Sequence, residues 1–476
     1  MKRRGGSGVK EEVVIGLDIG TTTVKALAVT DEGEVTASYA KTISAVYGEG
    51  GSCIAEPYQL LEAVVDVLKG IGHFCPTQSI KGLSLSSAMH SGMLLDENFK
   101  PLTPLLLWSD SRSKEVAKAM RKSAIGRQFY RQTGMPIHAM SPMIKFIWAK
   151  DQYKQAFQHY RYLAGIKSFL MEYLTGYFVV DQACAGATGL RNLYQRQWDK
   201  AILAEVDMDI DSLPRLVDST KVYPLSCPDL PEWESIPVMV GASDGCLATF
   251  ASYNGQVETS LTVGTSAAVR QMSSRIALDD KGRTFCYELT QGLYVIGAAS
   301  NNGGNVLQWA RKLFNRDFTD LCQLMKKGEI GAHGLSFTPY LLGERSLVMD
   351  EMVKGEFLHV SMQHQIEDFM RAIGEGLMMN LARLVALTEE VGEKSDQLVI
   401  SGGAMRFQPL KQILADLLNR PLIERIQEDS SAYGAAKFFY AYTEGLDKWR
   451  KQSACQLSTH PNLEAHESYC RLGKLP

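Results

Sequence analysis

The sequence predicts an α/β protein made of two duplicated domains, and three observations lead to this prediction. The chain has 476 residues, which suits two domains of roughly 200–250 residues better than one core. Strand-like and helix-like patterns alternate along its length. A strand–Gly-Thr–strand element occurs near the start and again near mid-chain. We therefore expect a flexible leader at 1–10, a first domain at 11–250 and a second domain at 251–476.

The first element is a β-meander. Val13–Ile19 has the apolar run of a buried strand and leads into a turn at Gly20–Thr23. Val24–Val29 is predicted to return as a second strand, and a further turn precedes a third strand at Val35–Ala40. Three such strands open a sheet.

The second copy follows the same plan. Leu261–Val263 leads into Gly264–Ser266 and out through Ala267–Val269. Aligning the two Gly-Thr pairs places Asp18 opposite Thr262. The repeat indicates duplicated domains that face each other across a central cleft. Two unrelated hairpins that share a short motif by coincidence are the alternative.

The segments around these hairpins have the periods of helices and strands. Apolar residues recur at helical spacing in 58–71, 365–391 and 410–418, and short apolar runs at 81–88, 238–240, 294–298 and 397–400 predict strands. Gly374 and Gly376 lie inside the longest predicted helix, where each costs up to ~1 kcal/mol relative to alanine. Close packing against another backbone explains them, and a kink is the alternative.

Composition excludes several classes of protein. The 50 basic and 53 acidic residues give a net charge of −3 and are interspersed, so a nucleic acid has no obvious binding surface. No apolar stretch reaches the ~18 residues of a membrane helix, and no secretory signal follows the basic start. The nine cysteines are scattered without a metal-binding spacing. They predict reduced thiols and a cytoplasmic protein.

Two turns have the composition of phosphate-binding loops. Backbone N–H groups in tight glycine turns bind phosphates without bulky side chains, and threonine hydroxyls add donors. Gly20-Thr21-Thr22 and Gly264-Thr265-Ser266 both fit this description. Asp18 directly precedes the first turn, so it is a candidate for holding Mg²⁺, through water because Mg²⁺ keeps much of its hydration shell. A structural hairpin is the alternative for each turn.

Three further segments combine small residues with a strand end. Gly402-Gly403 offers a surface without side chains for an adenine or ribose, and Asn301–Gly304 offers another close backbone approach. Asp244 follows the predicted strand 238–240 among small residues. If it faces the cleft, it can accept a proton from an attacking hydroxyl. Plain loops and an Asx turn are the alternatives.

Taken together, these motifs resemble the FGGY carbohydrate kinases, a branch of the actin–hexokinase–Hsp70 superfamily. The resemblance covers about residues 12–450 in the order of the family. It rests on GLDIGTTTVKA (16–26), SPMIKFIW (141–148), GASDG (241–245), LTVGTSAAV (261–269), NNGGNVLQW (301–309), MRAIGEG (370–376) and SGGAMRFQPLKQILAD (401–416). It implies two actin-like, ribonuclease H-like domains with ATP in the cleft between them.

The resemblance also implies roles for individual residues. It assigns Asp18 to Mg²⁺ and Asp244 to the catalytic base, which also contacts substrate. The implied ATP contacts are Thr21, Thr22, Lys25, Gly264, Thr265, Gly304, Gln308, Gly402 and Gly403.

Within the family the chain is most similar to the gluconate kinase branch, through segments such as LTPLLLWSDSRS (102–113), TGMPIHAMSP (133–142) and YLAGIKSFL (162–170). The implied reaction converts D-gluconate and ATP to 6-phosphogluconate. Met89, His90, Trp108 and Asp110 stand where the family binds its sugar, and Arg112, His138 and Lys145 add cationic or donor groups.

Other readings stay open. A kinase for xylulose, ribulose, glycerol or another polyol shares the same motifs. An actin- or Hsp70-like ATPase and a catalytically weak sugar sensor are the alternatives from other classes. Departures from the family pattern at Gly343–Asp350, Ala149, His359 and Phe407 bear on cleft closure and nucleotide affinity more than on the reaction. The sequence does not determine oligomeric state, and a homodimer is left open.

Overall fold

The computed structural model describes residues 12–256, 258–425, 429–445 and 456–473. The predicted leader at 1–10 and Cys455 lie outside these residues. The chain forms two compact units. The first comprises Met1–Asn254, Tyr287–Gly292 and Asp429–Ser453, and the second comprises Gly255–Cys286, Leu293–Glu428 and Ala454–Pro476. Each unit is thus built from discontinuous segments, whereas the predicted domains 11–250 and 251–476 are continuous.

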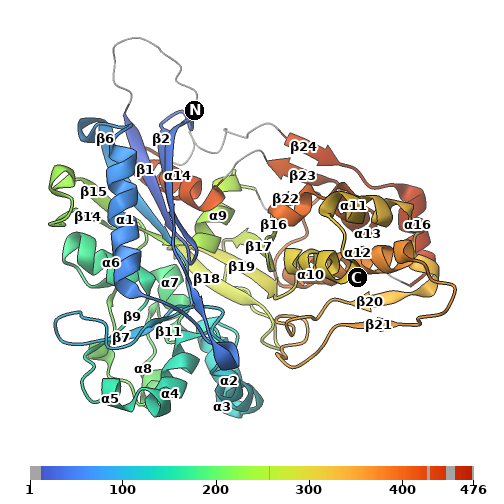
Figure 1. Cartoon of the computed structure of the whole chain (residues 1–476). Helices are drawn as coiled ribbons and strands as arrows, with labels where there is room; N and C mark the ends of the chain where they lie inside the picture. Colours follow the sequence, from blue (N-terminus) through green and yellow to red (C-terminus); the bar gives the residue numbers. More distant parts are fainter. Residues whose placement is uncertain (1–11, 257, 426–428, 446–455, 474–476) are drawn as a thin grey trace, which may run out of the picture. The chain divides into compact units, whose positions relative to one another are not determined.

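The first unit is built on a six-stranded sheet in the order β14-β15-β6-β1-β2-β3 (Figure 1). The three leading strands form the predicted antiparallel meander, and β6 and β15 run parallel to β1. The strands are β1 (Val13–Ile19), β2 (Thr23–Thr30), β3 (Val35–Thr42), β6 (Ile80–Ser87), β14 (Val222–Pro224) and β15 (Pro237–Ser243).

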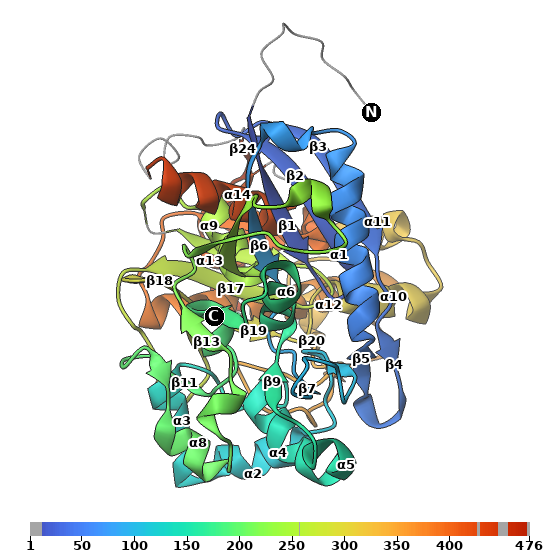
Figure 2. The same cartoon turned by 90° about the vertical axis from the view of Figure 1, so that its left-hand side faces the viewer.

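Helices cover both faces of this sheet (Figures 1 and 2). Successive strand residues point to opposite faces, and Ile15 and Leu17 join a core that includes α1 (Pro57–Gly72) and α6 (Ile166–Thr175). Gly16, between them, lies directly against Ala432 in α14 (Ser430–Thr443), which packs on α9 (Asp244–Ser252). By the same alternation, Asp18 lies on the α9–α14 face.

The shorter helices and strands of the first unit contribute a second cluster of buried apolar residues. It includes Phe129, Ile144 and Trp198. The helices are α2 (Lys114–Lys122), α3 (Ala124–Thr133), α4 (Pro142–Gln152), α5 (Lys154–Phe157), α7 (Gln182–Gly186) and α8 (Lys200–Glu205). The short sheets are β4 (Val46–Tyr47) with β5 (Cys53–Ala55) and β8 (Leu105–Leu106), β7 (Met93–Leu95) with β9 (Tyr162–Ala164), β10 (Val179–Asp181) with β13 (Arg215–Val217), and β11 (Arg191–Asn192) with β12 (Gln197–Trp198).

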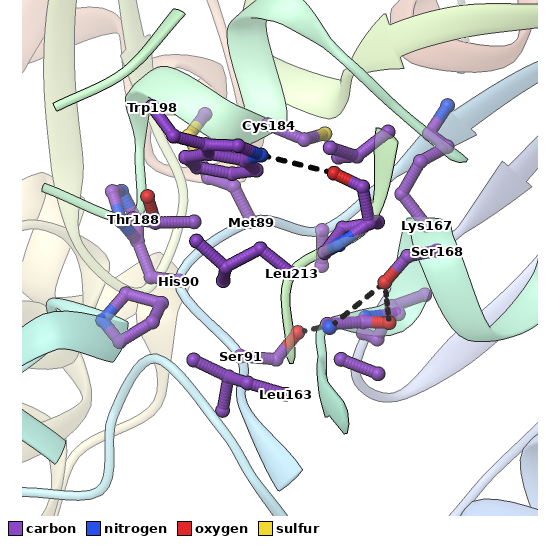
Figure 3. A pocket seen from close by; sticks show the side chains of 17 residues that line it. Met89, His90, Ser91, Leu163, Lys167, Ser168, Cys184, Thr188, Trp198 and Leu213 are labelled. Carbon is purple, nitrogen blue, oxygen red and sulfur yellow. Dashed lines mark hydrogen bonds between the residues drawn. The ribbon is translucent and has the colours of Figure 1, made fainter. Parts of the chain in front are cut away.

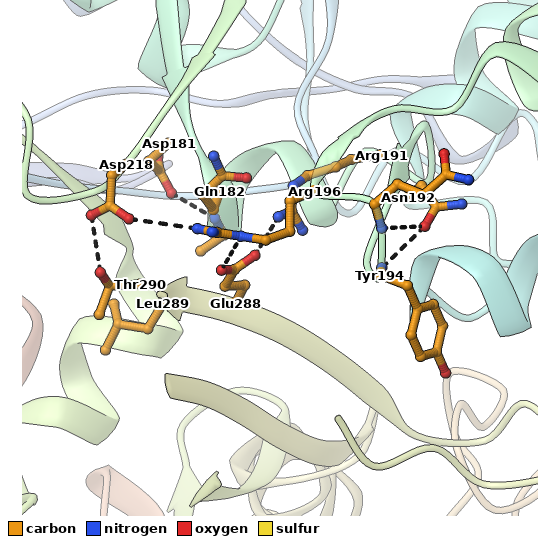
Figure 4. A network of polar contacts seen from close by, with 12 residues as sticks. Asp181, Gln182, Arg191, Asn192, Tyr194, Arg196, Asp218, Glu288, Leu289 and Thr290 are labelled. Atoms are coloured by element: carbon orange, nitrogen blue, oxygen red, sulfur yellow. Dashed lines mark hydrogen bonds and ion pairs between the residues drawn. The ribbon is translucent and has the colours of Figure 1, made fainter. Parts of the chain in front are cut away.

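A buried polar network ties the segment Tyr287–Gly292 into the first unit (Figure 4). Glu288 forms an ion pair with Arg191, and both side chains are fully buried. Arg196 Nε lies 2.8 Å from Glu288 Oε1. Thr290 Oγ1 donates to Asp218 Oδ1 at 2.9 Å. Because a buried charge is costly unless it is paired, this network fixes where the segment can lie.

The second unit is built on the strands β19-β17-β16-β22-β23-β24 of a seven-stranded sheet, whose remaining edge strand, β18, consists mostly of residues from the segment Tyr287–Gly292 assigned to the first unit. β16, β17 and β19 are antiparallel neighbours, and β22 and β23 run parallel to β16. The strands are β16 (Thr259–Val263), β17 (Ala267–Ser273), β18 (Phe285–Thr290), β19 (Leu293–Ser300), β22 (Leu398–Ser401), β23 (Leu422–Arg425) and β24 (Gln456–Thr459).

The two sheets repeat one topology, which confirms the predicted duplication. The order β3-β2-β1-β6-β15 in the first unit corresponds strand by strand, in position and direction, to β19-β17-β16-β22-β23 in the second. Each set of five is extended beyond its parallel edge by one antiparallel strand, β14 on β15 and β24 on β23, and β18 lies beside β19 at the other edge of the second sheet. The hairpin with the first Gly-Thr turn therefore has a true structural counterpart in the hairpin with the second.

The helices of the second unit pack around the long α12. They are α10 (Gly304–Phe314), α11 (Phe318–Lys327), α12 (Ile366–Val391), α13 (Gln408–Leu418) and α16 (Leu463–Arg471), with the small hairpin β20 (Ser336–Thr338) and β21 (Glu356–Leu358). A Cβ at Gly376 would lie 2.0 Å from the carbonyl oxygen of Phe337, and one at Gly374 would lie 2.7 Å from Met325 Sδ. Close packing, and not a kink, explains these two glycines.

Two general expectations can be checked against the described residues. In this part of the chain, no helix is both long enough and apolar enough to span a bilayer. All eight described cysteines are free thiols.

Candidate active site

The carboxyl ends of three parallel strands in the first unit bring Asp18, Ser86 and Asp244 to one edge of the sheet. Asp18 on β1 pairs in register with Ser86 on β6, and Ser86 Oγ donates to Asp18 Oδ1 at 2.6 Å. Asp244 follows β15 and is the first residue of α9. Its Oδ1 accepts from the Gly245 amide at 2.6 Å. The two acids that the sequence singles out thus lie in one region of the first unit.

Asp18 has the electrostatics of a cation-binding carboxylate. The pKa of Asp18 is raised to about 7, mainly by burial and also by the nearby carboxylates of Asp244 and Asp429. The Ser86 hydrogen bond and the Lys167 ammonium act in the opposite direction. Neighbouring carboxylates that repel each other favour protonation unless a cation is present.

Lys25 lies opposite Asp18 in the β1–β2 hairpin. Its Nζ forms an ion pair with Asp429, the residue that precedes α14 and adopts a left-handed backbone with φ of 62°. The predicted phosphate contact at Lys25 is therefore a cation already held by a carboxylate of the same unit. Asp429 is not indicated by any sequence pattern considered above.

The first predicted phosphate turn is closed by its backbone. The Gly20 amide donates to the Thr23 carbonyl oxygen at 3.0 Å, and Ile43 N donates to the Thr22 carbonyl at 2.9 Å. Thr21 is half-buried and Thr22 is exposed. Neither side-chain hydroxyl has a hydrogen bond within the described chain, so both can donate to a ligand.

The second predicted phosphate turn joins the glycine loop that follows β19. The Gly304 amide donates to the Gly264 carbonyl oxygen at 2.7 Å, and the Asn305 amide donates to the Thr265 carbonyl at 3.1 Å. A Cβ on Gly304 would lie 2.8 Å from the Gly264 oxygen. The turn and the start of α10 therefore form one backbone surface, at a helix N-terminus that favours anions.

The predicted adenosine contacts lie on the same side of the second unit. β22 is the parallel neighbour of β16, and Gly402 and Gly403 follow it directly. Gly402 has φ of 97°, and a Cβ there would lie 2.4 Å from the Val263 carbonyl oxygen. A Cβ on Gly403 would meet nothing within 4 Å. Gln308 is exposed one turn into α10.

Hydrogen bonds tie the atypical Gly343–Asp350 segment to the end of β19 and to the glycine loop after it, in the second unit. Glu344 is buried, and its Oε2 accepts from Ser300 Oγ at 2.6 Å and from Asn302 Nδ2 at 3.0 Å. Asn302 Nδ2 also donates to the Gly343 carbonyl at 2.8 Å. His359 has φ of 64°, a conformation that favours glycine. This backbone explains why the family pattern expects glycine at that position.

Met89 and His90 of the predicted sugar site follow β6. His90 has a positive φ of 65°, and its Nδ1 lies 3.0 Å from the Ala187 carbonyl oxygen. A carbonyl only accepts, so Nδ1 carries a proton in this contact. A cavity of about 40 Å³ lies beside Met89 and His90, lined also by Lys167, Cys184 and Trp198 (Figure 3). It holds a few waters at most, so it is too small for a hexonate.

Lys145 forms hydrogen bonds to two loops of the first unit that carry predicted sugar-binding residues. Its Nζ donates to the His90 carbonyl at 2.7 Å and also to the Leu107 carbonyl, next to Trp108. Burial lowers the pKa of Lys145 to about 7, against the opposing effect of Asp110. Lys145 therefore holds the backbone of the predicted sugar-binding residues and is itself buried.

Trp108 and Asp110 lie close to these loops but differ in surroundings. Trp108 keeps part of its surface exposed. Asp110 is buried: its Oδ2 accepts from the Cys53 amide at 3.0 Å and from Arg112 Nη2 at 2.7 Å. Arg112 stacks 4.6 Å from the Trp148 ring centroid. These bonds give Asp110 structural partners on β5 and within its own loop, and its contact with sugar stays a prediction.

Comparison with known proteins decides the family. Residues 13–251 match the N-terminal domain of the FGGY family of carbohydrate kinases, and residues 259–439 match its C-terminal domain. The chain belongs to the FGGY family of carbohydrate kinases. It is thus a phosphotransferase that acts on a sugar hydroxyl, and kinases of this family use ATP.

Individual relatives are kinases of different sugars, so they do not identify the sugar substrate. A gluconokinase of Bacillus subtilis is 31% identical across 96% of this chain and 92% of that protein. A xylulose kinase of Staphylococcus xylosus is 25% identical across 92% and 93%. The crystal structure of gluconate kinase from Lactobacillus acidophilus superposes with a TM-score of 0.90 and 27% identity, covering 97% of this chain and 96% of that one. The fold is the actin-like two-domain fold of FGGY kinases.

The acidic strand edge of the first unit can hold Mg²⁺ only together with ligands from outside the protein. No group of three or more His, Cys, Asp and Glu side chains suits a metal ion among the described residues. Asp18 supplies a hard oxygen ligand, and the repulsion from Asp244 and Asp429 that contributes to its raised pKa is one that a bound cation would relieve. Mg²⁺ is commonly bound by one or two carboxylates together with water and substrate phosphates. The residues fit an ion bound in this way.

Proposed function

We propose that this FGGY kinase transfers the γ-phosphoryl group of ATP to D-gluconate and forms 6-phosphogluconate. The observation that carries this proposal is the strand edge of the first unit, where Asp18 and Asp244 lie close enough to affect each other's charge. One acid at such an edge suits a metal-bound phosphate, and the other suits an attacking hydroxyl. Sugar binding on the same unit is part of the proposal.

Two observations support gluconate as the acceptor. Gluconokinases of two Bacillus species are 31% and 32% identical over more than nine-tenths of each chain, compared with 25–26% for the xylulose kinases. His90 has its Nδ1 proton committed to Ala187. A histidine at a predicted sugar contact can donate to a carboxylate when both of its ring nitrogens carry protons.

The residues of this chain divide the work. Asp244 orients the attacking hydroxyl and accepts its proton as the O–P bond forms. Its place at the first turn of α9 favours the ionised carboxylate. Thr21, Thr22 and Lys25 from the first unit, and Gly264, Thr265 and Gly304 from the second, are the proposed phosphate contacts.

The rest of the ATP site is proposed on the second unit, with Gln308, Gly402 and Gly403 contacting the nucleoside. Mg²⁺ held through Asp18 would supply charge neutralisation on the phosphates. Met89, His90, Trp108 and Asp110 are the proposed sugar contacts. The eight described free cysteines support a reducing compartment, and we place the reaction in the cytoplasm.

A pentulose kinase is the second candidate, because xylulose kinases match nearly the whole chain. The test measures ADP release with gluconate, D-xylulose, D-ribulose, glycerol and water as acceptors. We expect gluconate to give the highest kcat/KM. If xylulose or glycerol exceeds gluconate tenfold, the substrate is wrong although the kinase assignment stands. ADP release in water alone, at the same rate, would instead indicate an ATPase.

A further inference from the structure

Lys167 is a buried cation of the first unit that the reaction described so far does not use. It is the second residue of α6 and is only 2% exposed. Its Nζ donates to the carbonyl oxygens of Leu85 at 2.7 Å, Val240 at 2.6 Å and Ala242 at 3.2 Å. An ammonium has three N–H donors, so these three carbonyls account for all of them.

The three acceptors lie near the ends of the two strands that lead to the proposed site. Leu85 on β6 precedes Ser86, which donates to Asp18. Val240 and Ala242 lie on β15, and Ala242 is two residues before Asp244. Lys167 therefore bonds the backbone of both strands close to the proposed site, next to Ser86 on β6 and two and four residues before Asp244 on β15.

The ladder between β6 and β15 is irregular at this point. Its register shifts between Met239 and Ala242. Gly241 has φ of 64°, and a Cβ there would lie 2.0 Å from the Leu85 carbonyl oxygen. A bulge removes regular partners from the ladder and changes the direction of the residues that follow, and buried carbonyls need another donor. Lys167 supplies this donor.

The charge of Lys167 is balanced by several anions and polar groups. Burial lowers its pKa, and Asp181, Cys184, Asp18 and Asp244 raise it, in that order. In return, Lys167 lowers the pKa of Asp18. Figure 3 shows Lys167 at the edge of the small cavity that His90 also lines.

We propose that Lys167 is a positioning residue that sets the direction of Asp244 by tying the bulged end of β15 to the end of β6. The proposal rests on the proposed function, because it needs Asp244 to be the base. Displacing a reacting group by about 1 Å can cost ~10²-fold in rate. We therefore expect Lys167→Met to lower kcat by about 10- to 100-fold.

A double-mutant design separates this role from a merely structural one. Residues that act through one another are non-additive. If Lys167 acts through Asp244, then Lys167→Met should change the residual kcat of Asp244→Asn by less than about twofold. The control is Lys437→Met, because Lys437 is also buried and bonds the Ala251 and Tyr253 carbonyls at the far end of α9. We expect this control to lower the melting temperature while kcat stays within about threefold of wild type and its effect adds to that of Asp244→Asn.

The outcomes are distinct. Losses from Lys167→Met and Asp244→Asn that multiply would overturn the positioning role and leave the proposed function intact. An Asp244→Asn enzyme with more than a tenth of wild-type kcat would instead remove the base from the proposed function. If Lys167→Met melts below the assay temperature, Lys167→Gln, which keeps two N–H donors, is measured in the same cycle with the same expected non-additivity.

Discussion

The ends of β1 and β16 hold equivalent places in two sheets of one topology, yet their side chains differ in charge. In the first unit, Asp18 accepts a hydrogen bond from Ser86 on the parallel neighbour β6. In the second, Thr262 pairs with Ser401 on the parallel neighbour β22, and their hydroxyls lie 3.0 Å apart. A carboxylate–hydroxyl pair in one unit thus corresponds to a hydroxyl–hydroxyl pair in the other.

The surroundings extend this difference. Near Asp18 lie the carboxylates of Asp244 and Asp429 and the cations of Lys25 and Lys167. The turn after Thr262 meets the backbone of Gly303 and Gly304 instead. One copy of the fold has therefore gathered charge, which suits metal and proton chemistry, and the other exposes backbone, which suits binding of a nucleotide. A duplicated scaffold can carry two different halves of one reaction.

Among the substitutions that compare the two units, Asp18→Asn should give the largest effect, because it makes the first strand end as neutral as the second. We expect kcat at saturating Mg²⁺ to fall by about 10²–10³-fold, the usual loss when a preorganised charge contact is removed. The fold should be preserved, since this carboxyl is destabilised by burial and by like charges. Turnover is measured across a Mg²⁺ titration, with thermal melting as the control. Unchanged turnover would show that the metal is held elsewhere.

His90→Ala tests whether specificity also belongs to the charged unit. We expect a loss of about 1–3 kcal/mol in kcat/KM for gluconate, the cost of leaving one hydrogen-bonding group unpaired. A neutral polyol should lose less, because it has no carboxylate to bind. Steady-state kinetics with gluconate and xylitol gives the comparison. Equal losses for both acceptors would point to a structural histidine.

Lys145→Met probes a buried cation of the first unit through pH. The native pKa of Lys145 is about 7, below its usual value of 10.5. Between these two pKa values the unfolded chain binds more protons, so this lysine makes stability rise with pH by up to about 1.4 kcal/mol per unit. Between pH 7 and 9, the free energy of unfolding of the wild type should therefore rise relative to that of the variant. Below pH 6, the difference between the two free energies should stay constant. Urea melts measure both. Parallel curves throughout would mean that Lys145 is charged in the native state.

Thr262→Val should have the smallest effect. It removes one neutral hydrogen bond, worth about 1 kcal/mol, from the strand end that corresponds to Asp18. We expect kcat to stay within about fivefold of wild type. A loss above 100-fold would contradict the comparison, because the second strand end would then take part in the chemistry. The measurement is the same rate assay used for Asp18→Asn.

Most of the fold could be predicted from local patterns. The meander, the long helix and the two Gly-Thr hairpins follow from apolar period and turn residues, and aligning Asp18 with Thr262 anticipated their equivalent places. The grouping of Asp429 and α14 with the first unit could not be predicted. That contact joins residues about 400 positions apart, and no local pattern encodes it.

The candidate site shows the same limit. Asp18, Asp244 and the glycine turns were recognisable because small residues at strand ends have a meaning in the sequence. Lys167 was not, because a lysine near a helix start normally suggests solvent exposure. Its role depends on a bulge in β15 that appears only when the strands are paired.

In the proposed division of roles, the acidic strand end of the first unit performs proton and metal chemistry. Nucleotide binding rests mainly on the glycine turns. Asp244→Asn tests this division most directly, because it keeps the shape of the side chain and removes the base. ATP affinity is measured by calorimetry and kcat at saturating gluconate. We predict unchanged ATP affinity and a kcat lower by about 10²–10⁴-fold, the usual range for a general base. A variant that retains more than a tenth of wild-type kcat, or one that loses ATP binding as well, would contradict the account.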